Sequence, residues 1–320
     1  MQDKLIARAK ELLSEGKVKK VVGWKKGLFE DDITPALFTT AEELDKDFVF
    51  NKYCKANLSK YLVGITKNIE IAKSTTRMNN TMAKQRDPNA QDAPIPQEVV
   101  LVFLKPADTY SFTQLLKESR ITREDVYAIG VPCQDTIDGG DLCDNCAGKK
   151  PVSCDEYIGV DSNADVAPNN ARMEEVAKLE AMSVEERYNF WRNEFSRCIR
   201  CNACRNVCPA CTCEKCVFDN NALYTTQKVA ETNFEESLFH IIRAWHVAGR
   251  CTDCGECSRV CPQNIPLYLL NRKYIKDINE IYGDYQAGAD MESKPAMLCF
   301  QEDDPETTIV YDRSKDGGNE

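Results

Sequence analysis

The chain has 320 residues, of which 42% are hydrophobic, and carries a formal net charge of −10 with a pI near 5.0. The acidic balance argues against nucleic-acid binding, because no basic surplus is available to neutralise phosphates. The length fits about two folded domains with ordinary buried cores. We therefore expect other proteins, rather than nucleic acids, as partners.

The first predicted element is an amphipathic helix over residues 1–16, MQDKLIARAKELLSEG, with apolar residues on one stripe. This start lacks the continuous apolar core that a signal peptide needs. No later run approaches the roughly 18 apolar residues of a membrane span. We therefore expect a cytoplasmic protein.

The next elements form a βαβ unit. They are a buried strand, QEVVLVFLKP (97–106), a helix (109–120) and a second strand, EDVYAIGVPC (124–133). Asp108 is placed to cap the helix. An α/β domain with a short parallel sheet is expected over residues 1–160. Open parallel sheets bind ligands at the carboxyl ends of their strands, where Cys133 emerges.

A metal site is predicted directly after this unit. Cys143 and Cys146 form a C-x2-C pair behind Cys133, and Cys154 lies eight positions after Cys146. Thiols at such gaps chelate metal. The spacing by itself fits either zinc or an iron–sulfur cluster.

Two later runs match the bacterial ferredoxin pattern C-x2-C-x2-C-x3-C-P. Three closely spaced cysteines can wrap three corners of one cubane, whereas the fourth lies too far round and ligates the other cluster. The expected ligand sets therefore cross: Cys198, Cys201, Cys204 and Cys261 hold one [4Fe–4S] cluster, and Cys251, Cys254, Cys257 and Cys208 hold the other. Zinc sites would gain nothing from this exchange. Disulfides are disfavoured by the short gaps and the missing export signal.

Helices are predicted around both runs. Ser183 and Glu186 stand in capping-box register before the first run. Between the runs, apolar residues recur at helical spacing and Gly249 can end that helix: Phe234, Leu238, Ile241, Ile242 and Trp245. This pattern resembles the α-helical dicluster ferredoxin modules of fumarate reductase and heterodisulfide reductase subunits. The two histidines, His240 and His246, are expected to pack, with metal ligation as the lesser alternative.

The expected organisation is therefore an α+β multidomain protein. A linker and helix over 161–182 follow the α/β domain, and an α-helical ferredoxin domain with two [4Fe–4S] clusters spans 183–286. Residues 287–320 are expected to form an acidic extended tail that contacts a partner.

Longer segments carry a more specific resemblance. They are FNKYCKANLSKYL, IGVPCQ, CDNC, RYNFWRNEFSRCIRCNACRNVCP and HIIRAWHVAGRCTDCGECSRVCP. Together they resemble bacterial relatives of the coenzyme F-420 hydrogenase/dehydrogenase beta-subunit family that carry a C-terminal dicluster ferredoxin. The resemblance runs from about residue 45 to about residue 275. One departure is Lys105-Pro106-Ala107-Asp108, where the family commonly has a Gly-Cys-Asp turn.

The resemblance implies an electron-relay subunit, rather than a catalytic one, of an anaerobic multi-subunit oxidoreductase. Members of the family serve formate dehydrogenase, hydrogenase and heterodisulfide-reductase-like assemblies, so the implied partners are other redox subunits. Deazaflavin-using members also bind FAD, although no Gly-rich phosphate loop supports FAD here. The alternative to an electron relay is a catalytic subunit that binds a flavin or a deazaflavin. A third candidate function is that of a scaffold whose metals are purely structural.

The remaining cysteines leave the number of clusters at three or four. The third site takes Cys133, Cys143 and Cys146, with either Cys54 or Cys154 as its fourth ligand. Three further cysteines, Cys211, Cys213 and Cys216, are expected to ligate a fourth cluster, to bind zinc in a knot, or to pack without a metal. Cys299 in the tail is the spare. Five arginines flank the runs: Arg197, Arg200, Arg205, Arg250 and Arg259. They either offset the negative charge of the clusters or form solvated helix surface.

Overall fold

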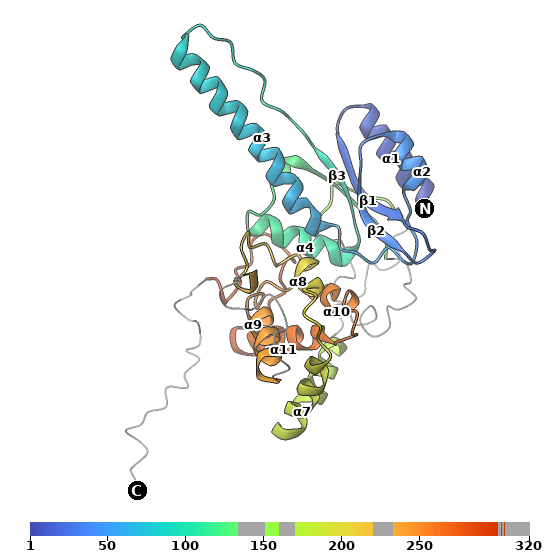
Figure 1. Cartoon of the computed structure of the whole chain (residues 1–320), viewed down its shortest axis with the longest axis vertical. Coiled ribbons are helices and arrows are strands. Elements are labelled where there is room, and N and C mark those ends of the chain that lie inside the picture. The colour runs from blue at the N-terminus through green and yellow to red at the C-terminus, as the bar shows by residue number, and fades with distance from the viewer. Residues whose placement is uncertain (134–150, 160–169, 220–232, 300–301, 303, 305–320) are drawn as a thin grey trace.

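The computed structural model describes residues 1–133, 151–159, 170–219, 233–299, 302 and 304. Figure 1 shows a domain with a β-sheet above a mostly helical domain. The predicted fold class, α+β with an N-terminal α/β domain and a C-terminal helical domain, is confirmed.

The N-terminal domain has a five-stranded sheet in the order β2-β1-β3-β4-β5. The strands are β1 (Lys20–Lys26), β2 (Ile33–Phe38), β3 (Val100–Leu104), β4 (Val126–Gly130) and β5 (Glu156–Tyr157). Strand β2 pairs antiparallel with β1, and the other neighbours are parallel. Every residue of β3 is buried, as expected for a central strand covered on both faces.

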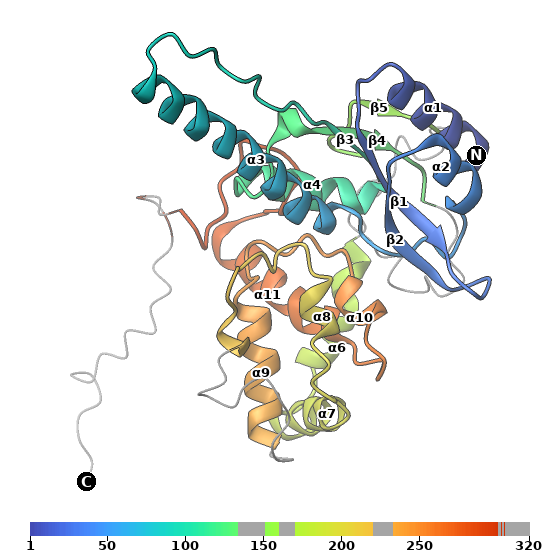
Figure 2. The ribbon, with the colours of Figure 1, turned by 45° about the horizontal axis from the view of Figure 1, so that its top comes forward.

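Helices cover both faces of this sheet. They are α1 (Gln2–Ser14), α2 (Ala41–Asp47), α3 (Ser59–Arg86), α4 (Pro106–Lys117) and the 3₁₀ turn η1 (Arg123–Asp125). In Figure 2, α1 and α2 lie on one side of the sheet, and α3 and α4 lie on the other. The far half of α3 extends beyond the sheet (Figures 1 and 2). There the Asn80 side chain donates to the backbone carbonyl of Ala93 in the returning chain and accepts from the Ala93 N–H.

The predicted βαβ unit is present with shifted helix bounds. Helix α4 begins at Pro106, because proline suits the first helical position, where no N–H donor is required. The prediction that Asp108 caps this helix is wrong: Lys105 occupies the N-cap position, and Asp108 is the third helical residue. The Asp108 side chain is instead buried, with 1% exposed.

The C-terminal domain is helical. Its elements are η2 (Asn170–Met173), α6 (Glu174–Glu180), α7 (Val184–Ser196), α8 (Ala203–Asn206), η3 (Val217–Asp219), α9 (Asn233–Trp245), α10 (Glu256–Arg259) and α11 (Leu267–Tyr282). The predicted Ser183–Glu186 capping box is confirmed at the start of α7. Helix α9 ends at Trp245, four residues before Gly249, whose φ of 70° belongs to the following turn.

Helix α4 joins the two domains. The Ser111 hydroxyl lies 2.9 Å from that of Thr252, which is in the second cysteine run. At the C-terminal end of α4, Arg250 donates from Nε to Oε1 of Glu118 at 2.8 Å. The backbone N–H of Asn57, just before α3, donates to the Glu256 carboxylate. The second run is therefore held against the α/β domain by polar contacts.

None of the helices in the described parts of the chain combines the length and apolar character that a membrane span requires.

Replacement of Asp108 by Asn should stabilise the protein near neutral pH. Burial raises the pKa of Asp108 to about 6, from an ordinary value of 3.8, and Oδ2 accepts no hydrogen bond from the described residues. A raised carboxyl pKa gives stability that is present below pH 4 and lost as the pH rises through 6. D108N should therefore match the wild type near pH 4 and exceed its free energy of unfolding by about 2 to 3 kcal/mol at pH 7.

Urea unfolding at both pH values measures this difference. The control is D3N, which changes an exposed aspartate in the first turn of α1 and should have little effect at either pH. An equal gain for D108N at pH 4 and pH 7 would contradict the assigned titration.

Candidate metal centre

The two cysteine runs have the same local backbone. The third residue of each run, Arg200 or Asp253, has a positive φ, 55° or 58°. The fifth residue, Asn202 or Gly255, also has a positive φ, 60° or 73°, and a four-residue helix follows it. In both runs the backbone N–H of the third residue faces the sulfur of the first cysteine. These turns gather N–H donors around the thiols, which stabilises the negative thiolate form.

The first expected ligand set lies around one pocket. The pocket is lined by Cys198, Cys201, Cys204 and Cys261, so the last cysteine of the second run has crossed to the first three of the first run. Ile265 and Leu267 supply an apolar wall. The four cysteines thus line the same pocket. Their assignment as ligands of one cluster stays a prediction.

The second expected set is brought together in the same way. The Cys208 thiol interacts electrostatically with each of Cys251, Cys254 and Cys257. Burial raises the pKa of all four thiols, with the hydrogen bond from Cys208 to Cys211 the largest cause for Cys208. Metal binding needs deprotonated thiols, so these sites require nearby positive charge.

Helix α9 turns its polar side chains toward the cysteines. Glu236, His240 and Arg243 are 3%, 1% and 2% exposed. The apolar residues of the same helix are mostly exposed, namely Phe234, Leu238, Ile241 and Trp245. A buried polar face opposite an exposed apolar one is costly unless the interior holds charge or hydrogen-bonding groups. The sequence pattern did not reveal which face turns inward.

Arg243 provides the test of whether a metal cluster fits. Its Nε, Nη1 and Nη2 atoms have no hydrogen-bond partner among the described residues. The guanidinium interacts electrostatically with Cys257, Cys204, Cys208 and Cys211. A buried cation without a carboxylate needs an anion, and thiolate-ligated clusters are anionic. The donor set and the unpaired cation therefore both fit an iron–sulfur cluster.

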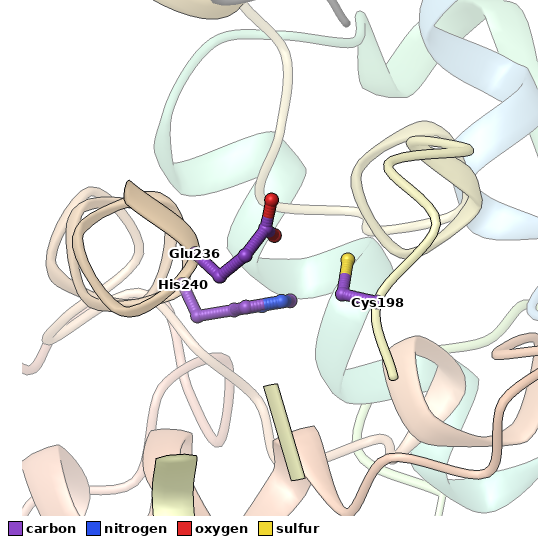
Figure 3. A group of neighbouring side chains, drawn as sticks. All are labelled: Cys198, Glu236 and His240. Atoms are coloured by element: carbon purple, nitrogen blue, oxygen red, sulfur yellow. The ribbon is translucent and has the colours of Figure 1, made fainter. Parts of the chain in front are cut away.

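A smaller group could hold a metal ion on geometry alone. Figure 3 shows Glu236 and His240 pointing from α9 toward Cys198, and their ligand atoms all lie within 4.8 Å of one another. Glu236 is already paired with Arg200, 3.1 Å away. The His240 ring stacks on Phe195, and burial lowers the pKa of His240 to about 3. His240 therefore serves as a packed, neutral imidazole in the wall of the cysteine pocket.

The flanking arginines all carry ion pairs. Their partners are Glu194 for Arg197, Glu236 for Arg200, Asp219 for Arg205, Glu118 for Arg250 and Glu256 for Arg259. These pairs leave little net charge to offset a cluster. Arg243, which sequence reasoning passed over, is buried and has no such pair among the described residues. A basic residue on the polar face of the helix between the two runs was the available signal.

The predicted third site is described only in part. Cys143 and Cys146 lie outside the described residues. Cys133 is exposed just after β4, and Cys154 packs beside Gly130 at the end of the same strand. Cys54 is buried, and its thiol lies 3.5 Å from the Val49 carbonyl oxygen. Lys105, after β3, donates to the Cys54 carbonyl, so both candidate ligands lie near the carboxyl edge of the sheet.

Of the remaining cysteines, Cys211 lies next to the second set. Cys211 is hydrogen-bonded through its thiol to Cys208, and Lys60 donates to the Cys211 carbonyl oxygen. Cys213 is exposed and Cys216 is half-buried. Cys299 is half-buried and interacts with Tyr285. A fourth cluster on Cys211, Cys213 and Cys216 stays a prediction.

Comparison with known families agrees with this geometry. Residues 194–265 match the family model described as a 4Fe-4S dicluster domain. The helical domain is thus a 4Fe–4S dicluster domain. The match includes both cysteine runs, so the dicluster domain contains the two crossed cysteine sets described above.

Two curated relatives extend the similarity. The chain is 32% identical over 122 residues to the F420-dependent formate dehydrogenase subunit beta of Methanocaldococcus jannaschii, covering 37% of this chain and 31% of that protein. It is 30% identical over 145 residues to the F420-dependent formate dehydrogenase 1 subunit beta of Methanococcus maripaludis, covering 41% and 36%. The matched part thus spans about a third of each relative. These matches confirm the resemblance to F420 dehydrogenase beta subunits.

The dicluster domain should depend on the Asp253 ion pairs. The Asp253 carboxylate accepts from Arg272 Nε at 2.9 Å and from Arg172 Nη1 at 3.3 Å, and all three side chains are buried. D253N keeps a residue type that tolerates positive φ while removing the charge. We expect a loss of about 3–5 kcal/mol in the free energy of unfolding, because two arginines lose their buried counter-ion.

Anaerobic urea unfolding and iron content measure the effect. The control is D277N, which breaks the more exposed Asp277–Lys273 pair on α11 and should cost at most about 1 kcal/mol. Similar stability for the two variants would show that the Asp253 pairs do not support the domain.

Proposed function

We propose that this chain is an iron–sulfur electron-transfer subunit of a multi-subunit oxidoreductase of the formate dehydrogenase, hydrogenase or heterodisulfide-reductase type. The observation that carries the proposal is the pair of crossed cysteine sets within one dicluster domain. When bound, a [4Fe–4S] cluster supplies one-electron transfer. The names of the relatives, formate dehydrogenase beta subunits, support the type of assembly.

The chain's own residues hold, insulate and orient the redox sites. Cys198, Cys201, Cys204 and Cys261 would hold the first cluster, and Cys251, Cys254, Cys257 and Cys208 the second. Aromatic residues of α7, such as Phe195 and Trp191, exclude water from the first site. Limited solvent access and fixed N–H donors set the potential at which a cluster accepts an electron.

The domain contacts suggest an order of sites. The second run meets α4 through the Ser111–Thr252 contact, and the segment after Cys54 meets Glu256. A third cluster at the carboxyl edge of the sheet would therefore lie on the side of the second cluster. We propose that electrons pass between the third site, the second cluster and the first cluster, with partner subunits at the two ends.

A second candidate is a catalytic subunit that binds a flavin or deazaflavin. It is favoured by the names of both relatives, which are called F420-dependent. The edge of the sheet beside Cys133 would then hold the ring next to the third cluster. Bound flavin in the purified protein, or reduction by F420, would favour this candidate.

Metal analysis of anaerobically purified protein tests the clusters. We expect about eight iron atoms per chain from the dicluster domain, about twelve with the third site and about sixteen with a fourth. Bleaching of the visible absorption by dithionite should accompany this iron. Zinc without iron that can be reduced would contradict both functions.

Double substitutions test the crossing of ligands. If Cys198 and Cys261 hold the same cluster, C198A/C261A should lose about four irons, no more than either single variant. If Cys257 and Cys261 hold different clusters, C257A/C261A should lose about eight. The opposite pattern would show that each run binds its own cluster.

We further propose that Cys154, rather than Cys54, completes the third site. Cys154 lies at the end of β4 beside Gly130, near Cys133, whereas the Cys54 thiol is engaged with its own loop. C154A should therefore lose about four irons and C54A should lose none. Iron content and EPR spectra of the reduced variants measure this, and loss in C54A alone would reverse the assignment.

A further inference from the structure

Arg243 differs from the other arginines near the cysteines. It projects from α9 into the dicluster domain, with 2% of its surface exposed, and three nitrogen atoms lack a partner among the described residues. The five arginines that flank the runs are all paired with carboxylates. Arg243 is therefore a positive charge that the described protein does not neutralise.

The position of Arg243 relates it to both cysteine sets. Its guanidinium interacts with Cys204, which belongs to the first set, and with Cys257 and Cys208, which belong to the second. Cys208 also lies in the first run, so the cation stands where the two runs exchange ligands. A planar guanidinium presents five N–H donors in fixed directions, which suits several sulfur acceptors at once.

Burial of this cation is unfavourable without an anion. A desolvated charge that lacks a partner strongly destabilises a fold. Its neighbours on α9, Glu236 and His240, do not compensate, because Glu236 is paired with Arg200 and His240 carries no hydrogen bond to Arg243. The described groups that interact favourably with the guanidinium are cysteine sulfurs, which become anionic when they hold metal.

We propose that Arg243 is a shared cation for both clusters, and that its N–H groups donate to the sulfur atoms of the two sets. The inference rests on the proposed electron-transfer function. A cluster gains one negative charge when it accepts an electron, so a nearby cation favours the reduced form and raises the reduction potential. Arg243 is a positioning residue that raises both potentials together and weakens repulsion between two reduced clusters.

The test is a redox titration with dithionite, followed by EPR, on full-length iron-loaded protein. In R243Q, which removes the charge but keeps a polar side chain, we expect the equilibrium constant for reduction of each dicluster site to fall at least tenfold. A tenfold fall equals about 59 mV for a one-electron couple. R243K keeps the charge without the planar donors, so its two potentials should fall less.

The matched control is R197Q. Arg197 directly precedes Cys198 in sequence, but its side chain is 45% exposed and paired with Glu194, so solvent screens it. In R197Q, the equilibrium constant for reduction of each cluster should stay within twofold of its wild-type value. The control separates a general loss of one positive charge from the loss of this buried one.

Each outcome decides the proposal. Unchanged potentials in iron-loaded R243Q overturn it, and a fall at one cluster alone overturns the shared role. If R243Q cannot retain iron, retention of iron by R243K supports the proposal, because R243K keeps the positive charge. An equal loss of iron in R243K overturns the proposal. Absence of reducible iron in the wild type would instead refute the proposed function.

Discussion

Negative charge on buried sulfur is the constraint on which the dicluster domain depends. Cys204 and Cys257 are 8% and 6% exposed, and burial raises the pKa of the Cys204 thiol to about 12. Thiolates can persist there only with a metal, N–H donors or a cation beside them. The repeated turns of the two runs provide the donors, and Arg243 on α9 provides the cation.

This constraint explains the unusual orientation of α9. A helix in a globular domain normally buries its apolar face. Here Glu236, His240 and Arg243 face inward, and Phe234 and Trp245 remain 73% and 55% exposed. The polar interior around the cysteines requires the charged face of α9. The apolar face of this helix therefore remains exposed in the described part of the chain.

The second run has a structural task as well as a chemical one. Asp253 anchors it to α11 through Arg272, and Thr252 and Glu256 anchor it to the α/β domain. The second run therefore lies against the sheet domain, and Cys208 of the first run lines a pocket with Ser111 and Cys254 at the same boundary. Fixed spacing between redox sites is what an electron relay requires, because the sites must stay close without moving. The same contacts make the stability of the fold and the placement of the sites interdependent.

Local patterns in the sequence determined the ferredoxin-type runs, the Ser183–Glu186 cap and the fully buried strand β3, because each of these depends on residues close together in the chain. Their chemistry can be read from spacing and side-chain type. The sequence misplaced Asp108, and it did not predict β1, β2 or α3. Only the tertiary structure decided that Asp108 is buried, that α9 turns its polar face inward and that Arg243 lies near both cysteine sets with no carboxylate partner in the described part of the chain. These features depend on contacts between segments far apart in the chain, and the electrostatics of a buried charge depend on all its neighbours at once.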